Sequence, residues 1–377
     1  MRTAERGLLT YANYFSTIFT PSDSSASAEP GCGLQSAFHF YPSADGESFG
    51  LLPVDRSPKL LHRTLKVGML SSTLKHDKSS ISIRIKRFGR DILGAKGKIS
   101  LARTNQLIFL CGANKSGGGP SARREAIKRF VEGLSRDYHV VYAENVFRDL
   151  AEIVHSKNVL DLENEISSIA DKILIVLESH SAFCELGAFA HQSLRSKLVI
   201  INDSHFQTKQ SFINIGPIAA AKEVNAPVLW YPMGNEVDIV DGIGATFNSL
   251  KDAVGVKSSR GSISISNDLS QLAATKESLY FVHDLVLFTG PLSHKELVHV
   301  LIAGFGDKNY DMLRRLLAVL RSAGLIRSFL DNGEWVYQSR ITKPFLQYPT
   351  NVNSLIASFR VFHLRMQPSR FDHAEYY

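Results

Sequence analysis

The polar side chains that could act on a ligand follow short apolar runs in this sequence. Glu185 lies in SHSAFCELGAF (179–189), which comes directly after the apolar run KILIVLE (172–178). We expect Glu185 in the first turn of a helix, where the macrodipole favours the ionised form of a carboxylate. An ionised carboxylate beside an anomeric carbon can attack that carbon or stabilise an oxocarbenium-like transition state. The alternative is a helix-capping charge without a catalytic role.

A glycine-rich loop, CGANKSGGGPSARRE (111–125), is a candidate for binding phosphate. Gly112 and Gly117 have the spacing of the two glycines in a Walker motif, but glycines also stand where that motif needs lysine and a hydroxyl. The missing lysine excludes an ATPase of that class. The loop could still bring backbone N–H groups up to a ligand, because glycine permits a close approach. Alternatively, it is only a flexible turn between a strand and a helix.

The sequence shows no recognisable Ser/His/Asp or Cys/His set and no metal-ligand spacing. Its cysteines are odd in number and far apart, so neither a disulfide framework nor a metal site is predicted. This pattern favours a reducing compartment, and we expect a cytoplasmic protein without a cofactor. Three histidines are interpreted as ordinary surface or core residues: His283, His294 and His299.

The region 105–235 alternates short apolar runs with amphipathic segments. Such runs predict strands buried on both faces, and the alternation predicts an α/β domain with a parallel sheet flanked by helices. Ligands of such sheets bind beyond the carboxyl ends of the strands. The segment SFINIGP (211–217) is expected to be a loop. The residues that follow predicted strands are Gly112, Glu144, Glu185 and Asn202. The expected strands are 107–112, 139–144, 172–177, 197–203 and 226–232.

The region 273–345 has a different pattern. It contains three expected helices, one of which begins with a capping box formed by Ser293 and Glu296 and another of which ends at Gly324. Two β-like runs around DNG (331–333) then predict a hairpin. Three helices and a hairpin in this order predict a winged helix-turn-helix. The arginines of its third helix could contact nucleic-acid phosphates or lie on a solvated surface: Arg314, Arg315 and Arg321.

The remaining segments complete the expected organisation. Residues 1–68 are rich in Ser, Pro and Gly and are interpreted as a disordered or non-native leader, with translation starting at Met69. A basic arm (69–104) follows, which either rests on phosphates or forms a solvated helix face. A connector (236–272) and a tail (346–377) flank the winged helix. The net charge of +7 favours an acidic or nucleic-acid partner, and neither a signal peptide nor a membrane span is expected.

Four stretches of the sequence resemble the nucleoside deoxyribosyltransferase-like domain of retron effector proteins: IFLCG, YAENVF, ADKILIVLESHSAFCELGAFA and SFINIGP. The predicted winged helix is similar to the DNA-binding half of the same effectors, so that the resemblance covers about 80–345. It implies that Glu185 is the nucleophile. The transferases often carry an aspartate six residues earlier, where this sequence has Ser179. We expect substrate-binding residues in the strand-end loops and motifs: Gly112, Asn114, Glu144, Ser179, Ser181 and Asn214.

The resemblance also implies a function and partners. Such effectors are held by a reverse transcriptase and its msDNA, and they are implicated in cleaving N-glycosidic bonds during phage infection, with NAD as a leading substrate. The resemblance therefore implies a toxin that converts NAD to nicotinamide and ADP-ribose. Similar enzymes often complete their sites across subunits, which implies a homo-oligomer. The alternatives are a metabolic nucleoside deoxyribosyltransferase or nucleotide hydrolase, which Ser179 disfavours, and a nucleotide-sensing winged-helix transcription regulator.

Overall fold

The computed structural model describes residues 69–76, 78–94, 99–102, 105–150, 159–191, 193–234, 240–255 and 268–372. All of them belong to one compact unit, Arg56–Tyr377. The predicted leader (1–68) and two parts of the predicted connector (236–239 and 256–267) lie outside the described residues. Among the helices described, none combines the length and the apolar character needed to cross a bilayer.

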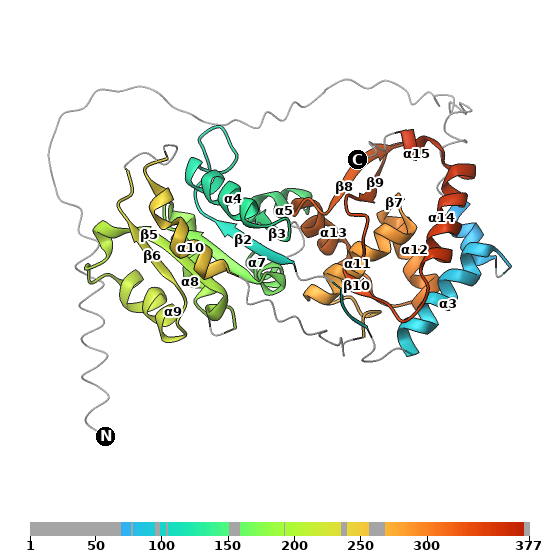
Figure 1. Cartoon of the computed structure of the whole chain (residues 1–377), viewed down its shortest axis with the longest axis horizontal. Helices are drawn as coiled ribbons and strands as arrows, with labels where there is room; N and C mark the ends of the chain where they lie inside the picture. Colours follow the sequence, from blue (N-terminus) through green and yellow to red (C-terminus); the bar gives the residue numbers. More distant parts are fainter. Residues whose placement is uncertain are drawn as a thin grey trace, which may run out of the picture. The chain divides into compact units, whose positions relative to one another are not determined.

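A five-stranded parallel sheet forms the core of the first half of this unit (Figure 1). The α/β fold expected from the alternating apolar runs is therefore confirmed. Each predicted strand lies within one or two residues of an observed one. The strand order is β3-β2-β4-β5-β6. The bounds are β2 Gln106–Cys111, β3 Tyr138–Tyr142, β4 Lys172–Val176, β5 Leu198–Asp203 and β6 Val228–Tyr231.

Helices cover both faces of the sheet. Successive strand residues point to opposite sides, so the continuous apolar strands present apolar side chains on both faces. In β4, Ile173 and Ile175 pack into one apolar cluster and Leu174 into the other. The first face carries α7 (Val159–Ile169), α8 (His180–Phe189) and α9 (Ala219–Glu223); the second carries α4 (Ala122–Leu134) and α10 (Phe247–Val254). The predicted loop 211–217 is wrong, because Asn214–Ile218 form a π-helical turn that continues into α9.

The strand order places the expected ligand-binding position at the carboxyl ends of the neighbouring strands β2 and β4. The helix that follows β2 is α4 on one face, and the helix that follows β4 is α8 on the other. Chain segments that leave neighbouring strands in opposite directions open a crevice at the carboxyl ends of those strands. We call this place the switch-point crevice. Another short helix, α5 (Ala143–Asp149), begins directly after β3.

The second half contains three helices and a small antiparallel sheet. The helices are α11 (Lys276–Thr289), α12 (His294–Phe305) and α13 (Met312–Ser322). The sheet has the order β7-β9-β8, from β7 (Leu292–Ser293), β8 (Ile326–Asp331) and β9 (Glu334–Ser339). The predicted capping box and hairpin are both confirmed. This arrangement is compatible with a winged helix-turn-helix.

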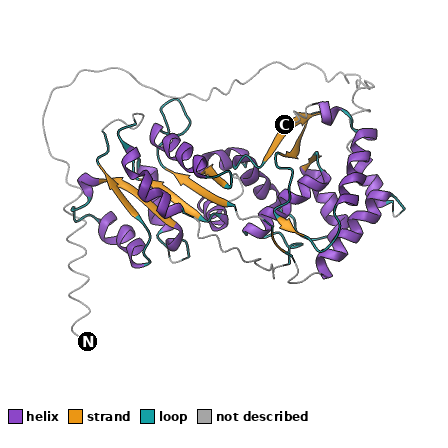
Figure 2. Ribbon diagram, viewed as in Figure 1, coloured by secondary structure: helices purple, strands orange, loops and turns teal. Residues whose placement is uncertain are grey.

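Segments before and after these two halves pack against the second half (Figure 2). Helix α3 (Ser80–Gly94) contacts both α12 and α14 (Asn353–Met366). A Cβ atom at Gly89 would lie 1.8 Å from the backbone oxygen of Gly304, so only glycine permits α3 and α12 to pack this closely. Strand β1 (Ser100–Leu101) pairs with β10 (Leu346–Gln347), and α15 (Ser369–Asp372) ends the described chain.

Candidate active site

Glu185 lies in the second turn of α8, and the prediction that placed it in the first turn is wrong. Ser179 is the N-cap, and its hydroxyl accepts a hydrogen bond from the Ala182 N–H at 3.3 Å. Glu185 is thus the sixth helical residue and lies beyond the reach of the helix dipole. Burial raises the pKa of Glu185 above its usual range, although the positive charge of Arg124 acts in the opposite direction. The expectation that the helix favours the ionised carboxylate is therefore also wrong.

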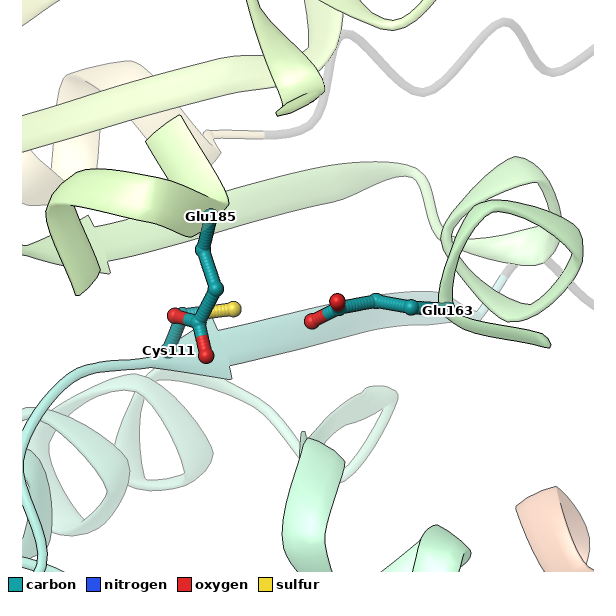
Figure 3. A group of neighbouring side chains, drawn as sticks. All are labelled: Cys111, Glu163 and Glu185. Carbon is teal, nitrogen blue, oxygen red and sulfur yellow. The ribbon is translucent and has the colours of Figure 1, made fainter. Parts of the chain in front are cut away.

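Glu185 is one member of a cluster with Cys111 and Glu163, which we call the carboxylate cluster (Figure 3). The three side chains come from the end of β2, from α7 and from α8, and their sulfur and oxygen atoms lie within 4.8 Å of one another. Glu163 is only 6% exposed and Cys111 only 1%. No other group of this kind converges among the described residues. It offers three donors, fewer than the four protein ligands of a structural zinc site.

The environment of the carboxylate cluster favours protonated groups. Burial, and after it the charge of Glu185, raises the pKa of Glu163 to about 7. Burial likewise raises the pKa of the Cys111 thiol. Glu163 and Glu185 are thus an electrostatically coupled pair, in which the charge of Glu185 favours the protonated form of Glu163. Such a pair can supply one ionised carboxylate as nucleophile and one protonated carboxyl as acid, as in retaining glycosidases, whose carboxyls lie ~5–5.5 Å apart.

Arg124 organises the other side of the crevice. It is 1% exposed, and it donates hydrogen bonds to Glu144 Oε2 at 2.8 Å, to Asn114 Oδ1 at 2.8 Å and to the backbone oxygens of Leu110 and Ala113. Three buried atoms in this neighbourhood have no hydrogen-bond partner among the described residues: Arg124 Nε, Glu144 Oε1 and Glu185 Oε2. Because unsatisfied buried polar atoms are rare, they indicate a place where a polar ligand or water binds.

Glu178, the second residue beyond β4, fixes the glycine-rich loop. Its carboxylate accepts hydrogen bonds from the Ala113 N–H at 3.0 Å, from the Ser121 hydroxyl at 2.6 Å and from Arg123 at 3.0 Å. A Cβ atom at Gly112 would lie 2.8 Å from Arg124 Cδ and 2.9 Å from Glu178 Oε1. The glycine at 112 is thus explained by close packing, and its contact with substrate stays a prediction.

The other residues predicted to bind substrate fall into two groups. Asn114 and Glu144 meet at Arg124, on the crevice side. Ser179 and Ser181 lie at the start of α8 with their hydroxyl oxygens 2.9 Å apart. Asn214 belongs to a different segment, where its amide donates to the backbone oxygens of Phe206 and Lys209. Its buried Oδ1 has no partner among the described residues.

A cavity of about 840 Å³ begins at Glu163 and extends over the outer side of α8. This volume lies within the ~300–1,000 Å³ typical of small-molecule sites. Its lining includes Gly187, His191 and Phe212, the last with 71% of its surface exposed. Glu163 thus belongs both to the carboxylate cluster and to the lining of this largely apolar cavity, which Cys111 and Glu185 do not line.

Sequence reasoning missed Arg124 and Glu163. Both stand in segments that were correctly expected to be helical, but only the register of each helix on the sheet shows that their side chains point inward. The only signal available was the pair of arginines directly after the glycine-rich loop and the acidic stretch DLENE (161–165) ahead of β4.

Two of the three arginines predicted to contact nucleic acid form ion pairs within the protein instead. Arg315 is 6% exposed and forms an ion pair with Glu165 of α7. Arg321 forms an ion pair with Asp149 of α5. The third, Arg314, lies near His294, and its charge adds to burial in lowering the pKa of that imidazole to about 4. Helix α13 therefore contacts the α/β half through two ion pairs. Its contact with nucleic acid stays a prediction.

The structure contains one Ser/His/Asp arrangement that the sequence did not reveal. His283 Nδ1 lies 2.9 Å from Asp284 Oδ1, and His283 Nε2 lies 2.9 Å from the Ser339 hydroxyl. Both His283 and Asp284 are fully buried, and the Ser339 hydroxyl is also bonded to the backbone oxygen of Ile341. Without access to substrate, this set is structural. The interpretation of His283 as a core histidine is confirmed.

Residues 120–328 match the family described as STM3845 retron effector protein, and this range includes Arg124, Glu163 and Glu185. The Escherichia coli protein named "Retron Ec73 putative ribosyltransferase/DNA-binding protein" is 36% identical over 282 residues, which cover 70% of this chain and 87% of that relative. The correspondingly named protein of retron Ec86, also from Escherichia coli, is 34% identical over 146 residues, 38% of this chain and 47% of that relative.

Proposed function

The chain belongs to the STM3845 retron effector protein family, and we propose that it is the toxin of a retron anti-phage defence system that cleaves an N-glycosidic bond. The bond we propose is the one between nicotinamide and ribose in NAD. One observation carries this proposal: Glu185, at the nucleophile position of the motif, has a buried carboxylate oxygen without a partner and belongs to the carboxylate cluster. The relatives' names, which include ribosyltransferase, support chemistry at a glycosidic carbon.

In the first step, a Glu185 oxygen attacks C1′ of the ribose while the bond from C1′ to the nicotinamide nitrogen breaks. The electron pair of that bond moves to the nitrogen and neutralises the pyridinium, so nicotinamide leaves without receiving a proton. The reaction needs Glu185 in its ionised form. Arg124 supports this form, because its positive charge opposes the effect of burial on the pKa of Glu185.

In the second step, water attacks C1′, the bond from C1′ to Glu185 breaks, and the electron pair returns to the carboxylate. The proton of the water must pass to a base. Glu163 is suited to accept it, because a pKa of about 7 lets the ionised and protonated forms coexist near neutral pH. We therefore assign Glu185 as the nucleophile and Glu163 as the acid–base partner.

A second candidate substrate class is a nucleoside or nucleotide with a neutral base. A neutral base leaves as an anion unless it is protonated, and a protonated Glu163 within the carboxylate cluster could supply that proton. Ser179 weighs against free deoxynucleosides. It stands where the transferases often carry aspartate, and its hydroxyl serves as the N-cap of α8. NAD therefore remains the preferred substrate.

We further propose that a reverse transcriptase and its msDNA hold this chain and control its activity. Membership of the retron effector family supports an association with a retron system. The net charge of +7 and the words "DNA-binding" in the relatives' names support a nucleic-acid partner. We expect expression of this chain without the other retron components to lower cellular NAD and stop growth.

The test is incubation of the purified full chain with NAD and chromatographic detection of nicotinamide. We expect Glu185→Gln to lower the rate at least ~100-fold, because it removes the nucleophile but keeps the side-chain shape. Glu223→Gln is the matched control. That carboxylate is 70% exposed and pairs with Arg195 on the surface, so its loss should leave the rate unchanged. A Glu185→Gln protein that releases nicotinamide at the wild-type rate would refute the assignment.

A further inference from the structure

A groove with a basic lining lies between α3 and the start of α14, outside the α/β half. Its cavity volume is about 680 Å³. We call it the basic groove. On one side the lining includes Lys78, Ser80, Ile83, Arg84 and Arg87; on the other it includes Thr350, Asn351 and Ser354.

The charge on the walls of the basic groove is strongly one-sided. The described residues that line it include three cationic side chains, Lys78, Arg84 and Arg87, and no carboxylate. One carboxylate of α3, Asp91, interacts with two of the lining residues. Asp91 accepts a hydrogen bond from the Thr350 hydroxyl at 2.7 Å, and it lies 3.9 Å from Arg87 Nε. The Arg87 side chain is nevertheless 76% exposed, so its guanidinium remains available to another anion. The groove therefore suits a ligand with several negative charges.

The spacing of the α3 residues suits a repeating anion. The inner side of α3 buries Ile81, Ile85 and Phe88, which leaves the groove side to Ser80, Arg84 and Arg87. These three positions lie one helical turn apart. At ~1.5 Å per residue they span about 10 Å. Measured along the axis of a DNA duplex, one strand carries about three phosphates over that length, at ~3.4 Å of axis per charge.

The opposite wall adds hydrogen-bond donors of the kind that contact phosphates. The Ser354 hydroxyl and the Asn351 amide lie at the start of the 14-residue helix α14, whereas the Thr350 hydroxyl already donates to Asp91. Serine, threonine and asparagine side chains, together with Lys and Arg, make most protein contacts to phosphate oxygens. The exposed side chain of Ile83, with 53% of its surface accessible, can pack against a sugar.

We propose that the basic groove binds the sugar–phosphate backbone of DNA, and that this surface, rather than α13, is the principal DNA contact of the chain. The inference deepens the proposed function, on which it rests for the choice of DNA as the polyanion. Helix α13 contributes less, because Arg315 and Arg321 are engaged with Glu165 and Asp149. Binding there would be independent of base sequence, since backbone contacts do not read the bases.

The test measures anisotropy of a fluorescein-labelled DNA duplex with the purified full chain across a salt series. The variant Lys78→Ala/Arg84→Ala/Arg87→Ala should bind at least tenfold more weakly at low salt. Its slope of log affinity against log salt should also be smaller by about 2 to 3, at ~0.9 per lost phosphate contact. The matched control, Arg129→Ala/Arg136→Ala/Lys251→Ala, removes the same charge from exposed sites on the α/β half and should keep wild-type binding.

Two further measurements separate the possible outcomes. Arg87→Glu alone, at a highly exposed position, should weaken binding without loss of thermal stability. NAD cleavage by the triple variant, and DNA binding by Glu185→Gln, should both stay at wild-type levels. DNA binding without NAD cleavage in the wild-type chain would refute the proposed enzyme but support the groove. Equal DNA affinities of the triple variant and the control, or binding of RNA but not of DNA, would refute the groove.

Discussion

The Glu163 carboxyl on α7 faces the Glu185 carboxyl on α8 across the last residue of β2 (Figure 3). Helix α7 leads into β4 and α8 leaves it, and because β3, β4 and β5 are parallel, both helices run back over the same face of the sheet in the same direction. This arrangement brings together two carboxylates that are 22 residues apart in the sequence. Two such groups cannot both ionise without a cost in repulsion, so the charge of Glu185 favours the protonated form of Glu163.

Substitution of Glu163 by glutamine should change the pH dependence of catalysis. Without the group whose pKa is about 7, the second step lacks its proton acceptor. We expect the rate of NAD cleavage to fall ~100-fold or more. The inflection near pH 7 should also disappear from the pH profile of kcat, which includes the second step. The measurement is initial nicotinamide release between about pH 5.5 and pH 9. An unaltered inflection in Glu163→Gln would show that another group titrates there.

The same variant should be more stable than the wild type at alkaline pH. The folded-state pKa of Glu163 is raised from 4.5 to about 7, so the folded protein binds this proton more tightly than the unfolded chain. The resulting stabilisation is complete below about pH 4.5 and is lost as the pH rises to 7. Above pH 7 the buried carboxylate costs roughly 3 kcal/mol, a cost that glutamine avoids. Thermal melts at pH 5 and pH 8 should show the larger gain for Glu163→Gln at pH 8.

A methyl group at Gly112 should disrupt the crevice from within. In Gly112→Ala the new Cβ atom would meet Arg124 and Glu178, both buried and held by hydrogen bonds. We expect a loss of ~1–3 kcal/mol in the free energy of unfolding, together with reduced NAD cleavage. Gly133→Ala is the matched control, because it stands in helix α4 with no atom within 4 Å of the added methyl. It should gain up to ~1 kcal/mol. Urea unfolding measures both changes.

The sheet could be predicted closely from the sequence, because each strand is a continuous apolar run bounded by polar residues. The run 172–177 needs no tertiary information to be identified as a buried strand. The strand order could not be predicted, since it depends on which helices pack on which face. For the same reason, the carboxylate cluster could not be predicted from the sequence. Residues 163 and 165 look equivalent in the sequence, yet Glu163 faces the sheet side while Glu165 faces Arg315.

The basic residues illustrate a second limit of the sequence. Arg87 and Arg321 both belong to clusters of arginine, and both are reasonable candidates for phosphate contact. Only the fold shows that Arg321 is paired with Asp149, whereas the guanidinium of Arg87 stays 76% exposed. Charge counts predict that a chain binds a polyanion; the location of that surface depends on which charges the folded protein has already neutralised.

The pairing of α13 with α5 leads to a prediction about coupling. Arg321 and Asp149 should be thermodynamically coupled in a double-mutant cycle, by ~0.5–1 kcal/mol, because the Arg321 side chain is still 38% exposed. Urea unfolding of Arg321→Ala, Asp149→Ala and the double variant gives the coupling energy. None of the three should change the salt dependence of DNA binding. Additive effects on unfolding would show that the two side chains do not interact in solution.

The buried Ser339–His283–Asp284 set should behave as a structural support and not as a catalytic triad. Asp284 accepts hydrogen bonds from the backbone N–H groups of Phe345 and Leu346, and from the Tyr348 hydroxyl. In Asp284→Asn one acceptor becomes a donor that meets another donor, and we expect a loss of ~1–3 kcal/mol in stability. Asp311→Asn is the control, because this aspartate is exposed and its side chain does not cap α13. Chemical denaturation measures the loss, and NAD cleavage per folded molecule should remain at the wild-type level in both variants. A stable Asp284→Asn protein with impaired cleavage would instead connect this buried set to the reaction.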